Sequence, residues 1–148
     1  MLLHGSCVAM AEAGVLLLAP PGGGKSDLAL RLLGRGALLV ADDQVELAIE
    51  AGALLARPPA TLAGRLEVRG LGLLDALPWQ VAPLALVVEL VPREAVPRLP
   101  APARWEALGI GLPLLRLDGR APSAPDVVCA ALDALAGRCG MTAGAFAA

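Results

Sequence analysis

The segment Ala19–Ser26, which reads APPGGGKS, constrains this chain more than any other feature. The continuous apolar run Val15–Ala19 leads into it and predicts a short buried strand. The segment Ser26–Leu33 follows with apolar residues on one helical face, and Gly34 and Gly36 end that helix. A strand, a glycine-rich turn carrying Lys-Ser and a helix are the context of a phosphate-binding P-loop.

This loop has the chemistry that a triphosphate requires, because it supplies consecutive backbone N–H groups at the start of a helix. Lys25 is predicted to offset phosphate charge, and the Ser26 hydroxyl to reach Mg²⁺. We therefore expect ATP and Mg²⁺ as ligands; the alternative is a glycine-rich turn that only caps a helix. Ala19 stands where the motif usually has glycine. The predicted nucleotide-binding residues are Ala19, Pro20, Pro21, Gly22, Gly23, Gly24, Lys25 and Ser26.

Further elements define the expected fold class. Short apolar runs predict strands, two of them joined as a hairpin, and a last helix is expected near the C-terminus. The strand segments are Ala37–Ala41, Val45–Ile49, Ala53–Arg57, Leu66–Val68 and Ala85–Leu90, and the helix runs from a Ser123 cap to about Arg138. Alternating strands and helices predict an α/β fold: one P-loop domain over residues 1–148, with a mostly buried sheet and a C-terminal helix.

The composition argues against nucleic acid as a partner. The chain has a formal net charge of -2, and its 12 Lys and Arg residues are scattered. Binding to a phosphate backbone depends on clustered basic residues. Trp79, Trp105 and Phe146 are too few and too far apart to stack bases.

The cysteines and the apolar runs bear on the compartment. Cys7, Cys129 and Cys139 are an odd number without a CxxC pair, which indicates a reduced, cytoplasmic location. No Lys or Arg precedes Lys25, so the charged region of a signal peptide is missing. The longest apolar stretches are too short to span a bilayer, and we expect no membrane association.

Two acidic residues, Asp42 and Asp43, close the predicted strand Ala37–Ala41. Carboxylates at the carboxyl end of a strand lie beside the crevice where α/β sheets bind ligands. One of the pair could hold Mg²⁺ while the other handles a proton. The alternative is a solvated strand end with no role in chemistry.

The run Gly22–Gly36 (GGGKSDLALRLLGRG), followed by LVADD at Leu39–Asp43 and LEVRGLGLL at Leu66–Leu74, resembles the bacterial HPr kinase/phosphorylase family. The resemblance is to a form with the C-terminal catalytic domain alone. Members phosphorylate a serine of the phosphocarrier protein HPr with ATP or pyrophosphate, and can remove that phosphate by phosphorolysis. The resemblance implies HPr as the partner, and it leaves a homo-oligomer among the expectations.

The resemblance also implies roles for individual residues. Lys25 takes the phosphate role and Ser26 binds Mg²⁺. Asp42 matches the family's catalytic base, with Asp43 as its neighbour, and Glu67 matches a second Mg²⁺ ligand. Without the resemblance, Glu67 would be interpreted as half of an exposed ion pair with its neighbour at position 69.

Two more residues gain a role from the resemblance. His4 precedes the P-loop at the spacing of the family's active-site histidine, although by itself it would be interpreted as a mobile terminal side chain or as one satisfied in a core. Arg98 matches an arginine that contacts the transferring phosphate, and Leu112–Arg116 resembles a segment linked to dephosphorylation. Two rival functions remain: a P-loop kinase or NTPase acting on a small molecule, and a non-catalytic nucleotide-binding module.

Overall fold

Strands dominate the computed structural model, which describes residues 1–147. The strands are β1 (Leu2–His4), β2 (Ser6–Met10), β3 (Ala13–Leu18), β4 (Leu38–Ala41), β5 (Gln44–Glu50), β6 (Ala53–Arg57), β7 (Leu66–Val68), β8 (Gly72–Leu74), β9 (Ala82–Leu90), β10 (Arg104–Ala107) and β11 (Ile110–Leu117). The helices are α1 (Lys25–Leu33) and α2 (Ala124–Leu135), with short 3-10 turns η1 (Ala60–Leu62) and η2 (Arg93–Ala95). The α/β class predicted from the sequence is confirmed.

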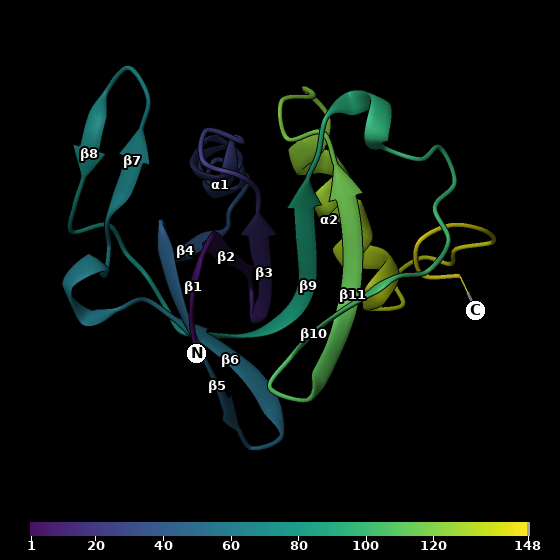
Figure 1. Ribbon diagram of the computed structural model, residues 1–148, viewed down its shortest axis with the longest axis horizontal. Coiled ribbons are helices and arrows are strands. Elements are labelled where there is room, and N and C mark those ends of the chain that lie inside the picture. The colour runs from purple at the N-terminus through teal and green to yellow at the C-terminus, as the bar shows by residue number, and fades with distance from the viewer. Residues whose placement is uncertain (148) are drawn as a thin grey trace.

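Most strands belong to one mixed, curled sheet in the order β1-β5-β6-β9-β3-β2-β4, to which β11 and β10 are added beside β9. Strands β3, β9 and β11 are parallel, so their carboxyl ends lie at one edge (Figure 1). Strand β2 runs antiparallel between β3 and β4. The hairpin β7–β8 is separate from this sheet and lies beside α1.

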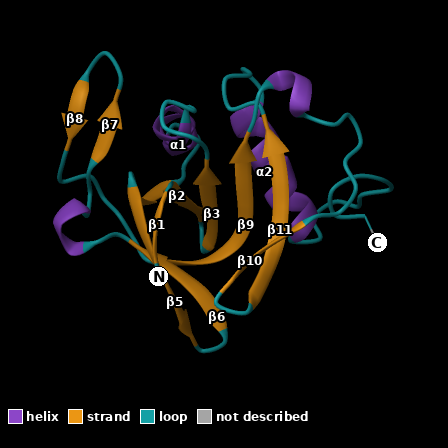
Figure 2. Ribbon diagram, in the orientation of Figure 1, coloured by secondary structure: helices purple, strands orange, loops and turns teal. Residues whose placement is uncertain are grey.

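The central strands are buried on both faces, which explains their continuous apolar runs. On β3, Val15 and Leu17 pack in one core with both helices, whereas Leu16 packs in a second core. The second core is closed by the curl of the sheet, since Val45 of β5 and Leu54 of β6 belong to it. In the view of Figure 2, α1 and α2 lie in the upper part of the molecule and the hairpin β5–β6 lies at the bottom.

Helix α2 ends earlier than predicted, at Leu135 instead of near Arg138. Gly137 has φ +76°, its N–H bonds to the Ala134 carbonyl, and the Arg138 N–H bonds to the Asp133 carbonyl. This pair of hydrogen bonds is a Schellman motif, which terminates a helix at a left-handed glycine. At the other end, Ser123 occupies the N-cap position as expected, but its side chain makes no capping hydrogen bond.

Strands β1, β2, β8, β10 and β11 were not predicted from the sequence. Strand β2 is buried, whereas much of the β10–β11 hairpin is partly exposed. Proline and glycine interrupt Ile110–Leu117, which weakens its strand pattern. Pairing with β9 through Leu114–Leu117 stabilises it as a strand all the same.

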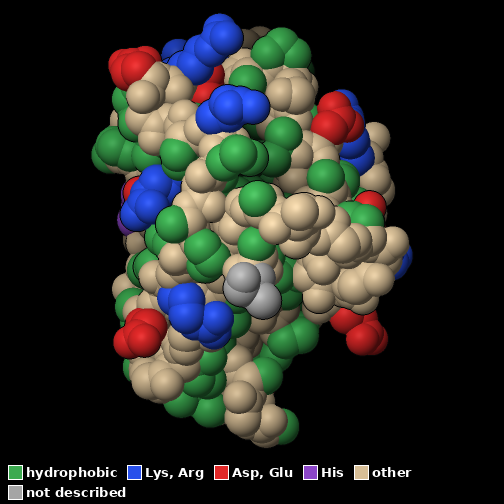
Figure 3. Space-filling model, turned by 90° about the vertical axis from the view of Figure 1, so that its right-hand side faces the viewer, with side chains coloured by type: hydrophobic (Ala, Val, Ile, Leu, Met, Phe, Trp, Pro, Cys, Tyr) green, Lys and Arg blue, Asp and Glu red, His purple; other side chains and the backbone are tan. Residues whose placement is uncertain are grey.

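The surface carries charges of both signs. On the face shown in Figure 3, Lys and Arg side chains are scattered among acidic and hydrophobic ones. None of the helices in residues 1–147 has the length and apolar character needed to cross a membrane.

Candidate functional site

The P-loop connects β3 to α1 through a tight turn. The Gly23 N–H donates to the Pro20 carbonyl at 2.9 Å, which places Pro21 and Gly22 at the centre of the turn. Gly22 has φ +76°, a conformation that glycine adopts without cost, and proline suits the position before it. Gly23 is required for another reason, because a Cβ there would lie 2.6 Å from the Ala19 Cβ.

The loop surface is open where an anion would bind. A Cβ at Gly22 or at Gly24 would meet no atom within 4 Å, so both face free space. The backbone N–H groups of Gly22, Gly24, Lys25 and Ser26 have no acceptor among the described residues. Unpaired N–H groups around an open space at a helix start fit the phosphates of a nucleotide.

Lys25 adds a cation to this cradle. Its side chain is only 7% exposed, and its Nζ donates to the carbonyls of Ala19 at 3.2 Å and Pro20 at 3.5 Å. No carboxylate in residues 1–147 forms a salt bridge with it. A buried ammonium paired only with carbonyls leaves its charge available to an anionic ligand.

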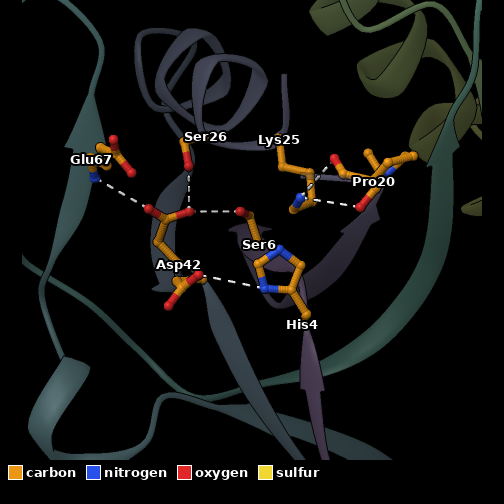
Figure 4. Close-up of polar contacts among 9 residues, drawn as sticks. His4, Ser6, Pro20, Lys25, Ser26, Asp42 and Glu67 are labelled. Carbon is orange, nitrogen blue, oxygen red and sulfur yellow. Dashed lines mark hydrogen bonds and ion pairs between the residues drawn. The ribbon is translucent and has the colours of Figure 1, made fainter. Parts of the chain in front are cut away.

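Asp42 is the hub of the neighbouring polar network (Figure 4). Its Oδ1 accepts hydrogen bonds from the hydroxyls of Ser6 at 2.6 Å and Ser26 at 2.8 Å. Its Oδ2 accepts one from the Glu67 backbone N–H at 3.2 Å. Three donors therefore hold this buried carboxylate in one orientation, next to the P-loop serine.

The sheet order explains how these residues meet. Strand β2 pairs with β4 through Cys7 and Ala41, so Ser6 at the start of β2 lies beside Asp42 at the end of β4. Ser26 comes from the first turn of α1. Ser6 was not predicted from the sequence as a site residue, because its only local signal is its closeness to His4. Burial raises the pKa of the neighbouring Cys7 thiol far above the usual range, which disfavours the reactive thiolate form.

His4 and Asp43 form a separate, exposed pair. His4 Nδ1 lies 3.4 Å from Asp43 Oδ1, and the two side chains are 49% and 65% exposed. Asp43 has φ +70°, in a three-residue turn closed by the Gln44 N–H on the Asp42 carbonyl at 2.8 Å. Strained backbone of this kind is concentrated at functional sites. The Gly5 N–H donates to the Asp43 carbonyl at 3.1 Å and so holds β1 against the turn.

Glu67 lies across Asp42 from Ser6 (Figure 4). Strand β7 is anchored by Leu66, which is fully buried in the core that contains α1, while the Glu67 side chain is exposed. No ion pair joins Glu67 to Arg69 in the described part of the chain, contrary to the simpler interpretation of these residues.

The oxygens of Ser26, Asp42 and Glu67 are hard donors of the kind that Mg²⁺ prefers. Within residues 1–147, no cluster of three or more His, Cys, Asp or Glu side chains is arranged to hold a metal. A hydroxyl and two carboxylates fit an ion that keeps several waters and shares nucleotide phosphates.

Arg98 is not brought into this network. It is exposed on the segment 92–102, and no hydrogen bond or ion pair among the described residues joins it to the other candidates. Another arginine does reach the P-loop: Arg120 Nη2 donates to the Gly22 carbonyl at 2.8 Å. Arg120 was not predicted from the sequence, because only the parallel placement of β11 brings the following loop to this edge.

Comparisons with known proteins agree on the family. The model of the HPr Serine kinase C-terminal domain matches residues 1–79. The HPr kinase/phosphorylase of Clostridium beijerinckii is 45% identical over 73 residues, and that of Bordetella pertussis is 50% identical over 74 residues. Each match covers 49% of this chain and 24% of the relative, so it spans about a quarter of the relatives' length.

The fold also matches a solved structure. The Hpr(Ser) kinase/phosphatase from Coxiella burnetii superposes with a TM-score of 0.81, covering 93% of this chain and 92% of that chain at 24% identity. The likeness therefore extends over the architecture as a whole. The matched residues 1–79 include the P-loop, both aspartates and Glu67. The chain belongs to the HPr serine kinase C-terminal domain family.

Proposed function

We propose that the protein transfers the γ-phosphoryl group of ATP to a serine of the phosphocarrier protein HPr, and that it reverses this reaction by phosphorolysis. In this proposal residues 1–148 act as one catalytic domain in the cytoplasm. The observation that carries the proposal is the 2.8 Å hydrogen bond between Ser26 Oγ and Asp42 Oδ1. It joins the phosphate cradle to the acidic strand end in the manner of a Mg²⁺-dependent phosphotransferase.

The cradle binds the nucleotide through the free backbone N–H groups of Gly22, Gly24 and the start of α1, and through the ammonium of Lys25. Mg²⁺, when bound by Ser26, Asp42 and Glu67, would offset charge on the β- and γ-phosphates. Ser26 of α1 and the backbone of Glu67 on β7 are tied to Asp42, at the end of β4, by two of the three hydrogen bonds on its carboxylate. The oxygens of Ser26 and Asp42 are thus preorganised, which is the main protein contribution to phosphoryl transfer.

Asp43, rather than Asp42, is better placed to take the proton of the acceptor serine. Both oxygens of Asp42 already accept hydrogen bonds, and its carboxylate is almost fully buried. The Asp43 side chain is 65% exposed, and within residues 1–147 its one ion pair is with His4. In the forward direction the serine oxygen bonds to phosphorus, the bond to the leaving ADP oxygen breaks, and Asp43 takes the proton. His4 orients that carboxylate.

The surroundings of the site favour a large acceptor over an enclosed metabolite. An open cavity of about 490 Å³ lies along the β7–β8 hairpin and includes Glu67 in its lining. Leu71 and Leu73 of the same hairpin are 70% and 65% exposed. Exposed apolar side chains beside a polar site are typical of a surface that contacts another protein.

Labelling with radioactive phosphate tests the proposal. The whole protein is incubated with γ-labelled ATP, Mg²⁺ and purified HPr, and the labelled residue is located by mass spectrometry. We expect label on one HPr serine, and its loss as pyrophosphate when phosphorylated HPr is then given inorganic phosphate.

Two controls sharpen this experiment. HPr with the labelled serine replaced by alanine should accept no phosphate, and Asp43→Asn enzyme should transfer almost none. Label that appears only in inorganic phosphate or in a small molecule would favour the rival NTPase or metabolite kinase. ATP binding without transfer to any acceptor would favour a regulatory module.

A further inference from the structure

Arg120 reaches the P-loop from the other end of the chain. It lies in the loop after β11, whose carboxyl end is at the same sheet edge as that of β3. Its Nη2 donates to the Gly22 carbonyl at 2.8 Å, and the side chain is otherwise exposed. No carboxylate among the described residues forms a salt bridge with this guanidinium.

This contact fixes one peptide unit of the P-loop at both ends. The carbonyl of Gly22 accepts from Arg120, and the N–H of the same peptide, on Gly23, donates to the Pro20 carbonyl. The neighbouring N–H groups of Gly22 and Gly24 stay free of other acceptors in residues 1–147. The guanidinium therefore lies against the loop without occupying the donors that face an anion.

The loop that carries Arg120 is itself fastened to α1. Arg31 of α1 donates to the carbonyls of Gly119 and Ala121, the residues on either side of Arg120. Asp27, in the first turn of α1, pairs with Arg31 at 3.0 Å. Helix α1, which follows the P-loop, therefore holds the backbone on both sides of Arg120 close to the P-loop.

Gly119 fits this arrangement closely. A Cβ there would lie 2.8 Å from a methyl of the Leu90 side chain, on the neighbouring strand β9. The Asp118 Oδ1 accepts from the Arg120 backbone N–H at 3.0 Å, which bends the chain back toward the loop. Packing and this hydrogen bond therefore restrain the backbone around Arg120, and with it the position from which the side chain extends.

We infer that the Arg120 guanidinium is a further cation of the phosphate site, supplied from within the chain, and that its positive charge strengthens binding of nucleotide polyphosphates. The inference rests on the proposed function, because it requires the P-loop to bind a nucleotide. Guanidinium groups keep their charge at all relevant pH values and present several N–H donors, of which the Gly22 carbonyl uses one. Lys25 alone is a small counter-charge for a triphosphate, and Arg120 supplements it.

Calorimetric binding of Mg·ATP and of pyrophosphate tests the inference on the whole protein. Arg120→Ala and Arg120→Gln should each weaken binding by about tenfold or more, whereas Arg120→Lys should retain most of the affinity. Glutamine can still donate to the Gly22 carbonyl but carries no charge. Removal of the charge should also reduce the dependence of affinity on salt, which a purely structural role would not do.

Arg104→Gln is the matched control. Arg104 Nη2 also donates to a glycine carbonyl, that of Gly111, at 2.8 Å, on the β10–β11 hairpin. This variant should bind Mg·ATP like the wild type, and melting temperatures should show that all variants fold.

If Arg120→Gln binds as tightly as the wild type while Arg120→Ala is weakened, the hydrogen bond to Gly22 matters and the charge does not, and the inference is overturned. Unchanged binding in every Arg120 variant overturns it as well. A wild-type protein that binds no Mg·ATP contradicts the proposed function itself, which separates the two failures.

Discussion

The Ser6 hydroxyl donates to Asp42 Oδ1 at 2.6 Å, and both residues are buried, Ser6 completely and Asp42 to 7% exposure. A buried carboxylate needs such donors, because burial of a charge without hydrogen-bond partners costs free energy. Ser6 therefore helps to hold Asp42 in the orientation that also accepts from Ser26. Two serines that are distant in sequence share one carboxylate oxygen.

Ser6→Ala should lower the free energy of unfolding by about 1.5–3 kcal/mol, since a hydrogen bond to a buried charged group is lost. It should also raise the Mg²⁺ concentration needed for half-maximal activity, because Asp42 is less firmly oriented. Urea denaturation and a Mg²⁺ titration measure the two effects. Ser123→Ala is the control, as the Ser123 side chain makes no capping hydrogen bond and should change neither quantity.

Substitutions of the two adjacent aspartates should have different effects on turnover and on ATP binding. Asp43→Asn is expected to reduce turnover by about 10²–10⁴-fold with little change in ATP affinity, because a base acts mainly in the transition state. Asparagine tolerates the positive φ of this position, so the turn should persist.

Asp42→Asn should weaken Mg²⁺-dependent ATP binding and also lower the melting temperature. An amide NH₂ in place of one carboxylate oxygen would face a donor, either a serine hydroxyl or the Glu67 N–H. Calorimetry, steady-state kinetics and thermal melting of the two variants separate these results. A turnover defect that is confined to Asp42→Asn would return the role of base to Asp42.

Glu67→Gln should raise the Mg²⁺ requirement while the melting temperature stays almost unchanged. Its side chain is exposed, and the hydrogen bond that joins it to Asp42 is made by its backbone N–H, which the substitution preserves. Loss of one anionic oxygen weakens a site for a hard cation. Glu106→Gln, at an exposed position on β10, is the control. An unchanged Mg²⁺ titration in Glu67→Gln would remove Glu67 from the metal site.

Lys25 is the only lysine of the chain, which permits a direct chemical test. An amine-reactive acyl-phosphate derivative of ATP should label Lys25, and excess ATP should protect it, as seen by mass spectrometry. Lys25→Ala should lower ATP affinity by at least about tenfold with a small change in stability, because the hydrogen bonds of its Nζ within residues 1–147 go to two loop carbonyls. Equal labelling with and without ATP would contradict a phosphate role for this amine.

Gly23→Ala should impair nucleotide binding because the new Cβ would lie 2.6 Å from the Ala19 Cβ and 2.8 Å from the Pro20 carbonyl oxygen. The loop must shift to accommodate it, and the donors around it would move. Gly140→Ala is the matched control, since a Cβ there meets no atom within 4 Å and the backbone φ is not in the left-handed region. Equal ATP affinity in both variants would show that the loop adjusts freely.

The sequence alone was enough to predict the P-loop, its flanking strand and helix, and the acidic end of β4, because each is encoded by neighbouring residues. A continuous apolar run predicts a doubly buried strand, and β3 is one. The glycines of the loop are needed for local conformation and local clearance, which neighbouring residues also reveal. The hairpin β5–β6 follows from the same kind of local pattern.

Only the tertiary structure decided which side chains meet. Strand β2 is inserted between β3 and β4, and that order brings Ser6 to Asp42, two residues that are 36 positions apart. The parallel placement of β11 beside β9 brings Arg120 to Gly22 across 98 positions. The order of strands that are distant in sequence depends on burial of both sheet faces by the whole chain, and no local pattern encodes it. For that reason the difference between the two aspartates is visible only in the folded protein. Asp43 is exposed and pairs with His4, whereas both carboxylate oxygens of Asp42 already accept hydrogen bonds.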